Sequence, residues 1–345
     1  MTRRNFLKQS IGGGALLSLA TPAAAQGTTS LRLLATDAIT AATLADQISA
    51  ATGNTFVIET TIVPLTEAGT ILDRVSSGEA DMGLTALDHF MPKNLAFGLF
   101  ASMPFGMAAG ELDSWVLASD GGDMLAMLGD ELGVTFRFAG DGGAKPIWSK
   151  EPLSDLSAFQ AKSVGSTGLG MLNMQKVGVA SVADLGNPSI DLNGLDILDG
   201  LSVVEMSEKG LTDFPHMTLA NPNKPSAAYT LAISQPAYEG LSAGHRVVLE
   251  RACSASMSHG RARNFHENAV ALRNAGDTLS ASPLPNDIWQ ALQKSAQSVL
   301  ATVYEDNDIA ATIVDSYVYF LTDIAAWSEI GEAAFYDGRK RLSSL

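Results

Sequence analysis

Residues 30–35 read SLRLLA, residues 56–63 read FVIETTIV and residues 81–85 read DMGLT. Each of these short runs is rich in apolar or β-branched residues, which is typical of a strand. Apolar residues at helical spacing over about 41–51 predict a helix that ends at Gly53. A second helix is predicted over about 67–77 and ends at Gly78. Alternating strands and helices predict an α/β architecture with a largely parallel sheet.

The strand and helix series begins again beyond a glycine-rich passage at 121–143. Residues 162–164 predict a strand, residues 169–176 a helix, and residues 228–233 a strand that returns to the first unit. We therefore expect two lobes with a cleft between them, which is a preferred place for a small-ligand site. The expected lobes are 26–150 plus about 228–275, and 151–227 plus about 276–345.

The last third of the chain is predicted to be mostly helical. The expected helices cover about 235–274 with a break near 241–243, then 286–307, then 309–336. Pro283 and Pro285 precede the second of these, as proline is tolerated at a helix entry. The predicted fold class is thus α/β, with mixed sheets flanked by helices and long C-terminal helices.

The first 25 residues are typical of an export signal of the twin-arginine type. Arg3 and Arg4 precede a modest apolar run, and Ala23–Ala25 supplies the small residues that a signal peptidase needs. The apolar run is too short and too glycine-rich to span a bilayer, which takes roughly 20 apolar residues. The mature protein is therefore expected in the periplasm, where most ATP- and NAD-dependent chemistry is excluded.

Composition removes several other function classes. The formal net charge of −15 disfavours nucleic-acid binding, and no cluster of lysine and arginine offsets it. Cys253 is the single cysteine and lies in a helical pattern, so we expect a buried, inert thiol. The five histidines do not show metal-ligand spacing, and no nucleophile-elbow motif is present.

Several segments resemble the solute-binding proteins of TRAP (tripartite ATP-independent periplasmic) transporters, in order from about residue 31 to residue 341. They are Val75–Asp81, Phe100–Met107 with Glu111 and Trp115, Trp148 with Lys150–Leu156, and Ser316-Tyr317 with Phe320, Trp327, Glu329 and Arg339. The last group is similar to the subgroup that handles 2-oxo acids and related carboxylates. The resemblance implies a two-lobed, type II-like periplasmic binding protein.

The function implied is capture of a small organic acid and its delivery to membrane permease subunits. In the family, an arginine on the strand after the Asp-Leu segment pairs with the ligand carboxylate. The matching position here is Lys162, which follows Asp155-Leu156. A lysine offers a point charge in place of the planar guanidinium fork, so the carboxylate would be held with less geometric selectivity.

The same subgroup often holds a cation, such as sodium or calcium, beside the ligand. The position of its glutamine corresponds to Lys145, and its later acid–tryptophan pair corresponds to Glu205-Met206. An ammonium has no lone pair for a metal. We therefore expect no metal and no cofactor, with Lys145 supplying the positive charge instead.

The remaining candidates each have two interpretations. Trp148 either packs the lobe interface or forms a wall beside the ligand, and Phe90 either lies in the core or faces the cleft. Glu205, expected at a strand end after Val203-Val204, could pair with Lys145 or Lys162, hold a ligand hydroxyl, or be a surface charge.

Two rival functions stay open at this stage. A periplasmic lyase or isomerase could use Lys145 or Lys162 as a base, if burial lowered the lysine pKa. A ligand-sensing receptor subunit would present its closed form to a membrane sensor. The resemblance also allows a homodimer formed through the C-terminal helices.

Overall fold

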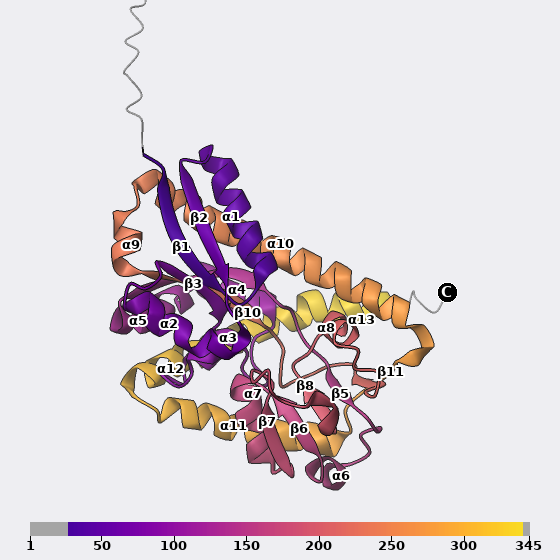
Figure 1. Cartoon of the computed structure of the whole chain (residues 1–345). Coiled ribbons are helices and arrows are strands. Elements are labelled where there is room, and N and C mark those ends of the chain that lie inside the picture. The colour runs from indigo at the N-terminus through magenta and orange to yellow at the C-terminus, as the bar shows by residue number, and fades with distance from the viewer. Residues whose placement is uncertain (1–26, 341–345) are drawn as a thin grey trace, which may run out of the picture.

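Two mixed β-sheets, one in each lobe, organise the computed structural model, which describes residues 27–340 (Figure 1). The predicted export signal lies outside the described residues. The first sheet has the order β2-β1-β3-β10-β4 and the second has the order β11-β9-β5-β8-β6-β7. The strands are β1 (Thr29–Ala35), β2 (Phe56–Ile62), β3 (Met82–Ala86), β4 (Val134–Asp141), β5 (Ile147–Ser149), β6 (Ser163–Ser166), β7 (Ser181–Asp184), β8 (Ile197–Asp199), β9 (His216–Thr218), β10 (Ala228–Ser234) and β11 (Ser280–Ser282).

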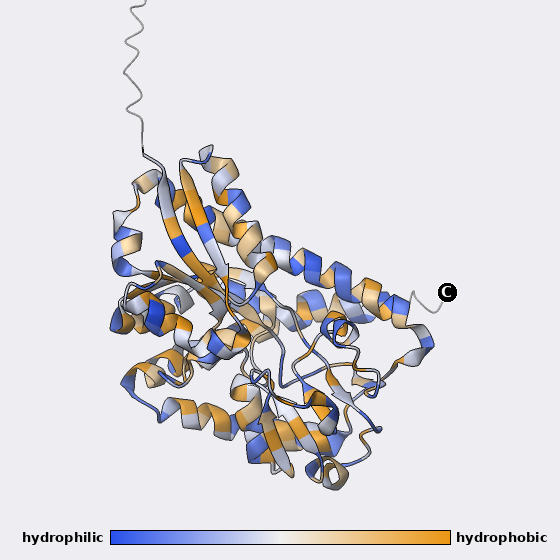
Figure 2. Ribbon diagram, viewed as in Figure 1, coloured by the Kyte–Doolittle hydropathy of each residue, from blue (hydrophilic) through white to orange (hydrophobic). Residues whose placement is uncertain are grey.

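Helices cover both sheets. They are α1 (Ala38–Thr52), α2 (Ile71–Ser76), α3 (Phe97–Ala101), α4 (Ala109–Ala118), α5 (Gly121–Leu132), α6 (Leu156–Gln160), α7 (Gly168–Val177), α8 (Val203–Glu208), α9 (Gln235–Gly240), α10 (Ala243–Ala275), α11 (Asn286–Tyr304), α12 (Asp308–Ser328) and α13 (Ala334–Lys340). Figure 2 shows apolar residues concentrated on the strands of the first lobe, with polar and apolar residues mixed along α10.

The predicted start of the first lobe is confirmed. Strand β1 pairs in parallel with β2 and β3, and α1 crosses between β1 and β2. Asp37 caps α1, because its side chain accepts a hydrogen bond from the Thr40 amide at 2.7 Å. The helix ends at Gly53, whose φ of 57° is the left-handed conformation that glycine adopts without strain. These local signals place the carboxyl ends of β1 and β3 at one edge of the sheet.

The chain crosses between the lobes more than once, and the crossings differ slightly from the expected boundaries. Strand β5 pairs with β8 and β9, so the first crossing lies at 142–146 and not near residue 150. The return crossing precedes β10, which runs antiparallel between β3 and β4. Helix α10 has 33 residues and contacts β4 of the first lobe and α8 of the second. It therefore braces both lobes.

The C-terminal helices divide between the lobes, whereas the sequence placed all of 276–345 with the second. Helix α11 packs on α7, but α12 packs on α4 and α5 of the first lobe. The indole N–H of Trp115 donates to the Ser316 hydroxyl at 3.0 Å, and the Met107 amide donates to the Tyr317 hydroxyl at 2.9 Å. Deep apolar packing around Trp115 fixes α12 there, which helical periodicity alone could not reveal.

The continuous helical segment Asp308–Arg339 is long and apolar enough to cross a membrane by length and composition alone, and its most apolar 18-residue window has a mean hydropathy of 1.3. Only 22% of its most apolar window is buried in the protein. Its exposed large apolar side chains are Val318, Tyr319, Trp327, Ile330, Phe335 and Tyr336.

Glu205 lies in helix α8, which corrects its expected place at a strand end. Ser202 and Glu205 form a capping box, in which the Glu205 amide donates to the Ser202 hydroxyl and the Ser202 amide donates to the Glu205 carboxylate. The Val203-Val204 pair looked like a strand, but the Ser-x-x-Glu signal around it decides the local structure.

Candidate functional site

A cavity of about 320 Å³ lies between the two lobes. Its lining residues follow the carboxyl ends of strands in both sheets: Asp37 follows β1, Asp88 follows β3, Thr167 follows β6 and Gly200 follows β8. Ligands of open α/β sheets bind at this edge, because the loops there are free to converge. The topology therefore brings side chains from distant parts of the chain to one small cleft.

Lys224 is a buried cation in this cavity. The side chain is 5% exposed, and Nζ donates to the Thr167 carbonyl at 2.7 Å and to the Thr167 hydroxyl at 2.8 Å. An ammonium has three donors, so one is left for a ligand. No carboxylate among residues 27–340 forms an ion pair with Lys224. Burial lowers the pKa of Lys224, and the nearby charges of Asp88 and Asp199 oppose that shift only in part.

The loop that carries Lys224 is fixed by a buried carboxylate. Asp199 accepts hydrogen bonds from the Ser166 hydroxyl at 2.6 Å, from the Asn221 amide group at 2.6 Å, and from Asn223. Gly170 leaves room for the aliphatic part of the Lys224 side chain, because a Cβ at position 170 would lie only 2.8 Å from Cε of Lys224. The charged end of Lys224 is thus positioned before any ligand arrives.

Two residues with hydroxyl groups, Ser102 and Tyr229, also line the cavity. The Ser102 hydroxyl is buried and has no hydrogen-bond partner within the described chain. Burial raises the pKa of Tyr229 to about 12, so its hydroxyl stays protonated and can donate. A buried polar group without a partner is costly, which points to a polar ligand at this place.

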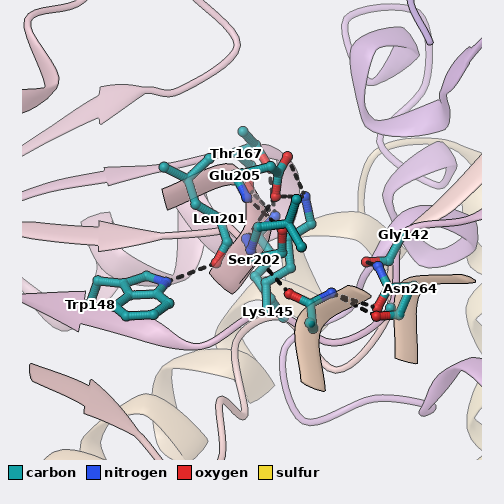
Figure 3. A network of polar contacts seen from close by, with 12 residues as sticks. Gly142, Lys145, Trp148, Thr167, Leu201, Ser202, Glu205 and Asn264 are labelled. Carbon is teal, nitrogen blue, oxygen red and sulfur yellow. Dashed lines mark hydrogen bonds and ion pairs between the residues drawn. The ribbon is translucent and has the colours of Figure 1, made fainter. Parts of the chain in front are cut away.

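Lys145 and Glu205 form an ion pair at the same cavity (Figure 3). The ammonium nitrogen lies 3.0 and 3.1 Å from the two carboxylate oxygens. Burial would lower the pKa of Lys145, but the Glu205 charge outweighs it and the net shift is upward. Burial would raise the pKa of Glu205, but Lys145 and the Ser202 amide bring it below its ordinary value. Both groups are therefore charged at neutral pH.

Two asparagines of α10 bond to the two segments that carry this ion pair. The Asn264 amide group donates to the Gly142 carbonyl at 2.6 Å, and the Asn268 amide group donates to the Asn264 carbonyl at 2.9 Å. The Val204 amide donates to the Asn268 side chain at 3.3 Å. One helix thus links the first crossing, which carries Lys145, to α8, which carries Glu205 (Figure 3).

The structure brings together two of the six residues proposed from sequence, namely Lys145 and Glu205. Lys162 is not among the described residues that line the cavity. It precedes β6, whereas Thr167 follows that strand, which separates them by roughly 16 Å at 3.3 Å per residue. The site proposed below therefore does not include Lys162.

The three apolar candidates lie in hydrophobic cores. Phe90 is buried against Phe97 and Phe136. Trp148 is fully buried, and its indole N–H donates to the Leu201 carbonyl at 2.8 Å (Figure 3). Met206 packs in the same core as Trp148, and both border a groove of about 840 Å³ between α8 and α10.

Sequence reasoning missed Lys224, Ser102 and Asp88. Asp88 comes soon after a predicted strand, and Asp37 follows the neighbouring parallel strand, so the rule for carboxyl ends could have placed both acids at the cleft. Lys224 stands between Pro222 and Pro225 in a connection between lobes, which is a weaker signal. Nothing in the sequence marks Ser102.

Burial raises the pKa of the Cys253 thiol to about 12, and Cys253 is buried as predicted. Within residues 27–340, no three side chains of His, Cys, Asp or Glu converge as a group that could hold a metal ion.

Comparison with known proteins supports the expected fold. No family model matches the chain. A TRAP transporter solute-binding protein from Bordetella bronchiseptica, solved as a mixed-occupancy dimer with copurified calcium and picolinate, has a TM-score of 0.84 at 19% identity and covers 92% of this chain and 99% of its own. A TRAP periplasmic solute-binding protein from Pseudoalteromonas atlantica, solved with sodium and pyruvate, has a TM-score of 0.82 at 20% identity and covers 90% and 99%. A Bordetella pertussis extracytoplasmic solute receptor that binds pyroglutamic acid has a TM-score of 0.70 at 16% identity and covers 84% and 99%.

Proposed function

We propose, from the premise that this chain has the fold of TRAP solute-binding proteins, that it captures a small organic acid in its interlobe cleft. It would work in the periplasm, reached by the twin-arginine route, and would deliver its ligand to membrane permease subunits. The acid is a 2-oxo acid or a related small carboxylate. The observation that carries this proposal is Lys224, a buried ammonium with an unused donor at the cavity.

The same geometry favours a carrier over an enzyme. A lysine base would need to be neutral, but the charge of Glu205 raises the pKa of Lys145 above its ordinary value despite burial. Burial lowers the pKa of Lys224, but its nitrogen donates two hydrogen bonds to Thr167, which orient it as a donor toward a ligand. The carboxylate would be held by Lys224, with the Ser102 and Tyr229 hydroxyls as further donors.

We also propose that binding needs no metal cation, unlike the calcium- and sodium-containing structures above. The Lys145 ammonium contacts both oxygens of Glu205, and an ammonium has no lone pair for a metal and repels a cation placed beside it. Positive charge beside the ligand would come from Lys145 and Lys224. The residues present therefore do not fit a metal centre.

A ligand screen tests both statements. The mature protein is heated with a panel of small carboxylates, amides and sugars, before and after treatment with a chelator. At 100 times its dissociation constant, a true ligand adds about 2.7 kcal/mol to the free energy of unfolding, which gives a clear rise in melting temperature. We expect carboxylates alone to give this rise, with and without chelator. A response to neutral sugars only would refute the acid-binding function, and loss of the response on chelation would refute the metal-free site.

We further propose a homodimer formed through the C-terminal helices. The exposed apolar side chains along α12 and α13 would be buried by contact with a second copy of the chain. The groove between α8 and α10, which is lined by apolar residues among others, is the surface that we expect them to contact. We expect a dimer by light scattering after gel filtration. Replacing Tyr319, Ile330 and Phe335 by serine should give a folded monomer, because all three are exposed within one protomer. A monomeric parent protein would contradict the proposal.

A further inference from the structure

A second chamber extends the cleft beyond the cavity that holds Lys224. Its volume is about 560 Å³. The two cavities share five lining residues, namely Leu65, Asp88, His89, Thr167 and Gly186. Asp88 belongs to the first lobe and meets the second at Gly168, where an added Cβ would lie 2.8 Å from Cβ of Asp88. Asp88 therefore stands at the boundary between the two chambers.

Charge is distributed unevenly along this cleft. Lys145 and Lys224 line the inner chamber, whereas no described residue lining the outer chamber is a lysine or an arginine. The carboxylates of the whole cleft are Asp37, Asp88, Asp184 and Glu205. Four carboxylates against two lysine ammonium groups leave two formal negative charges. A simple carboxylate ligand would add a third.

Asp88 is the carboxylate with one oxygen that has no hydrogen-bond partner, although Lys145 and Lys224 lie near enough to interact with its charge. Asp37 accepts from the Thr40 amide, Asp184 accepts from the Gly186 amide, and Glu205 is paired with Lys145. By contrast, Oδ1 of Asp88 is buried and accepts no hydrogen bond from any described residue. A buried carboxylate oxygen without a donor is costly, and a donor brought by the ligand would relieve that cost.

We propose that the ligand is a small amino acid or a similar zwitterion. Its carboxylate binds Lys224 in the inner chamber, and its ammonium group donates to Asp88 at the boundary with the outer chamber. This inference rests on the proposed function, because it assumes that Lys224 holds a carboxylate. A zwitterion adds no net charge to a cleft that is already negative, and it provides the donor that Asp88 lacks.

Five acids with the same number of carbons separate the possibilities: butyrate, 2-oxobutyrate, 2-aminobutyrate, 4-aminobutyrate and succinate. Titration calorimetry gives the dissociation constant of each for the mature protein in chelator-treated buffer. We expect at least one aminobutyrate to bind about tenfold or more tightly than butyrate and 2-oxobutyrate, as for a hydrogen bond to a charged group. Succinate should bind weakest, because its second carboxylate would face Asp88.

Two variants test whether Asp88 causes the preference for an amino acid over a simple acid. Asp88→Asn should reduce the ratio of butyrate to aminobutyrate dissociation constants to about threefold or less. Asp46→Asn, which removes an exposed carboxylate from α1 in the same lobe, should leave that ratio as in the parent protein. The inference is overturned if 2-oxobutyrate or succinate binds as tightly as both amino acids. It is also overturned if the preference survives Asp88→Asn, or if tight binding of a simple acid requires added sodium or calcium. If none of the five acids binds while a neutral solute does, the acid-binding function itself has failed.

Discussion

Replacing Lys224 by methionine is expected to weaken carboxylate binding by about 100-fold, or about 2.7 kcal/mol. The change removes the buried ammonium that has a donor to spare, and methionine keeps a similar length of apolar chain in the passage beside Gly170. The ligand carboxylate would then be desolvated without a cation. Titration calorimetry with the tightest carboxylate of the ligand screen measures the loss.

The matched control is Lys162→Met, because Lys162 precedes β6 and stands outside the cavity. It should leave the dissociation constant within about twofold of the parent value, as for a substitution that touches no ligand. The two lysines thus test the structure against the family resemblance, which assigned the carboxylate to Lys162. A large loss of carboxylate affinity in Lys162→Met and none in Lys224→Met would show that Lys162, and not Lys224, holds the ligand.

Unfolding and pH dependence separate a binding role for Lys224 from a structural one. Lys224→Met removes the burial cost of the ammonium but also its two hydrogen bonds to Thr167, so the ligand-free variant should melt within about 3 °C of the parent. In the parent, the lowered pKa of Lys224 means that carboxylate affinity falls as pH rises toward that pKa, below the ordinary lysine value of 10.5. The variant should lack this alkaline decline. An unchanged decline in Lys224→Met would show that another group titrates.

The first lobe was predictable in detail because its local signals agree. Alternating strands and amphipathic helices, the Asp37 cap and the Gly53 stop all indicate the same β1-α1-β2 unit. The resemblance to TRAP solute-binding proteins is likewise confirmed at the level of the fold. The error at α8 has a local cause, since two β-branched residues lie inside a capping box.

The site was less predictable, because it depends on which ends of the strands face each other. Alignment with the family motif places Lys162 at the start of a strand, but it does not reveal that the cleft lies at the other end of that strand. For Glu205 the sequence left open a pairing with Lys145 or Lys162, a bond to a ligand hydroxyl, or a surface position. The structure shows the pairing with Lys145. Ser102 is a candidate only because of its position at the cavity, so no pattern of residues could have singled it out.

The other large effect concerns Arg261 of α10, which joins two carboxylates at the first crossing between the lobes. Its Nε donates to Asp141 at 2.6 Å, and its Nη2 contacts Asp113. Asp141 ends β4 and also accepts from the Gly143 amide at 2.6 Å, so Arg261 helps to fix the segment that leads to Lys145. Arg261→Met should lower the free energy of unfolding by about 3 kcal/mol, because it leaves the buried Asp141 and the partly buried Asp113 without their cation. Urea denaturation measures the change.

The pH dependence of that loss identifies its cause. Burial raises the pKa of Asp113, and Arg261 opposes the rise; without Arg261 the pKa of Asp113 should rise further. A folded state that binds more protons than the unfolded state gains stability as pH falls. The loss in free energy of unfolding caused by Arg261→Met should therefore be smaller at pH 5 than at pH 7.5. Arg261→Lys should lie between parent and methionine variant, since an ammonium cannot bridge both carboxylates as the guanidinium fork does. Arg251→Met, on an exposed position of α10, should cost no more than about 0.5 kcal/mol at either pH. A deficit for Arg261→Met that is equal at both pH values would mean that lost packing, and not unpaired charge, holds the crossing in place.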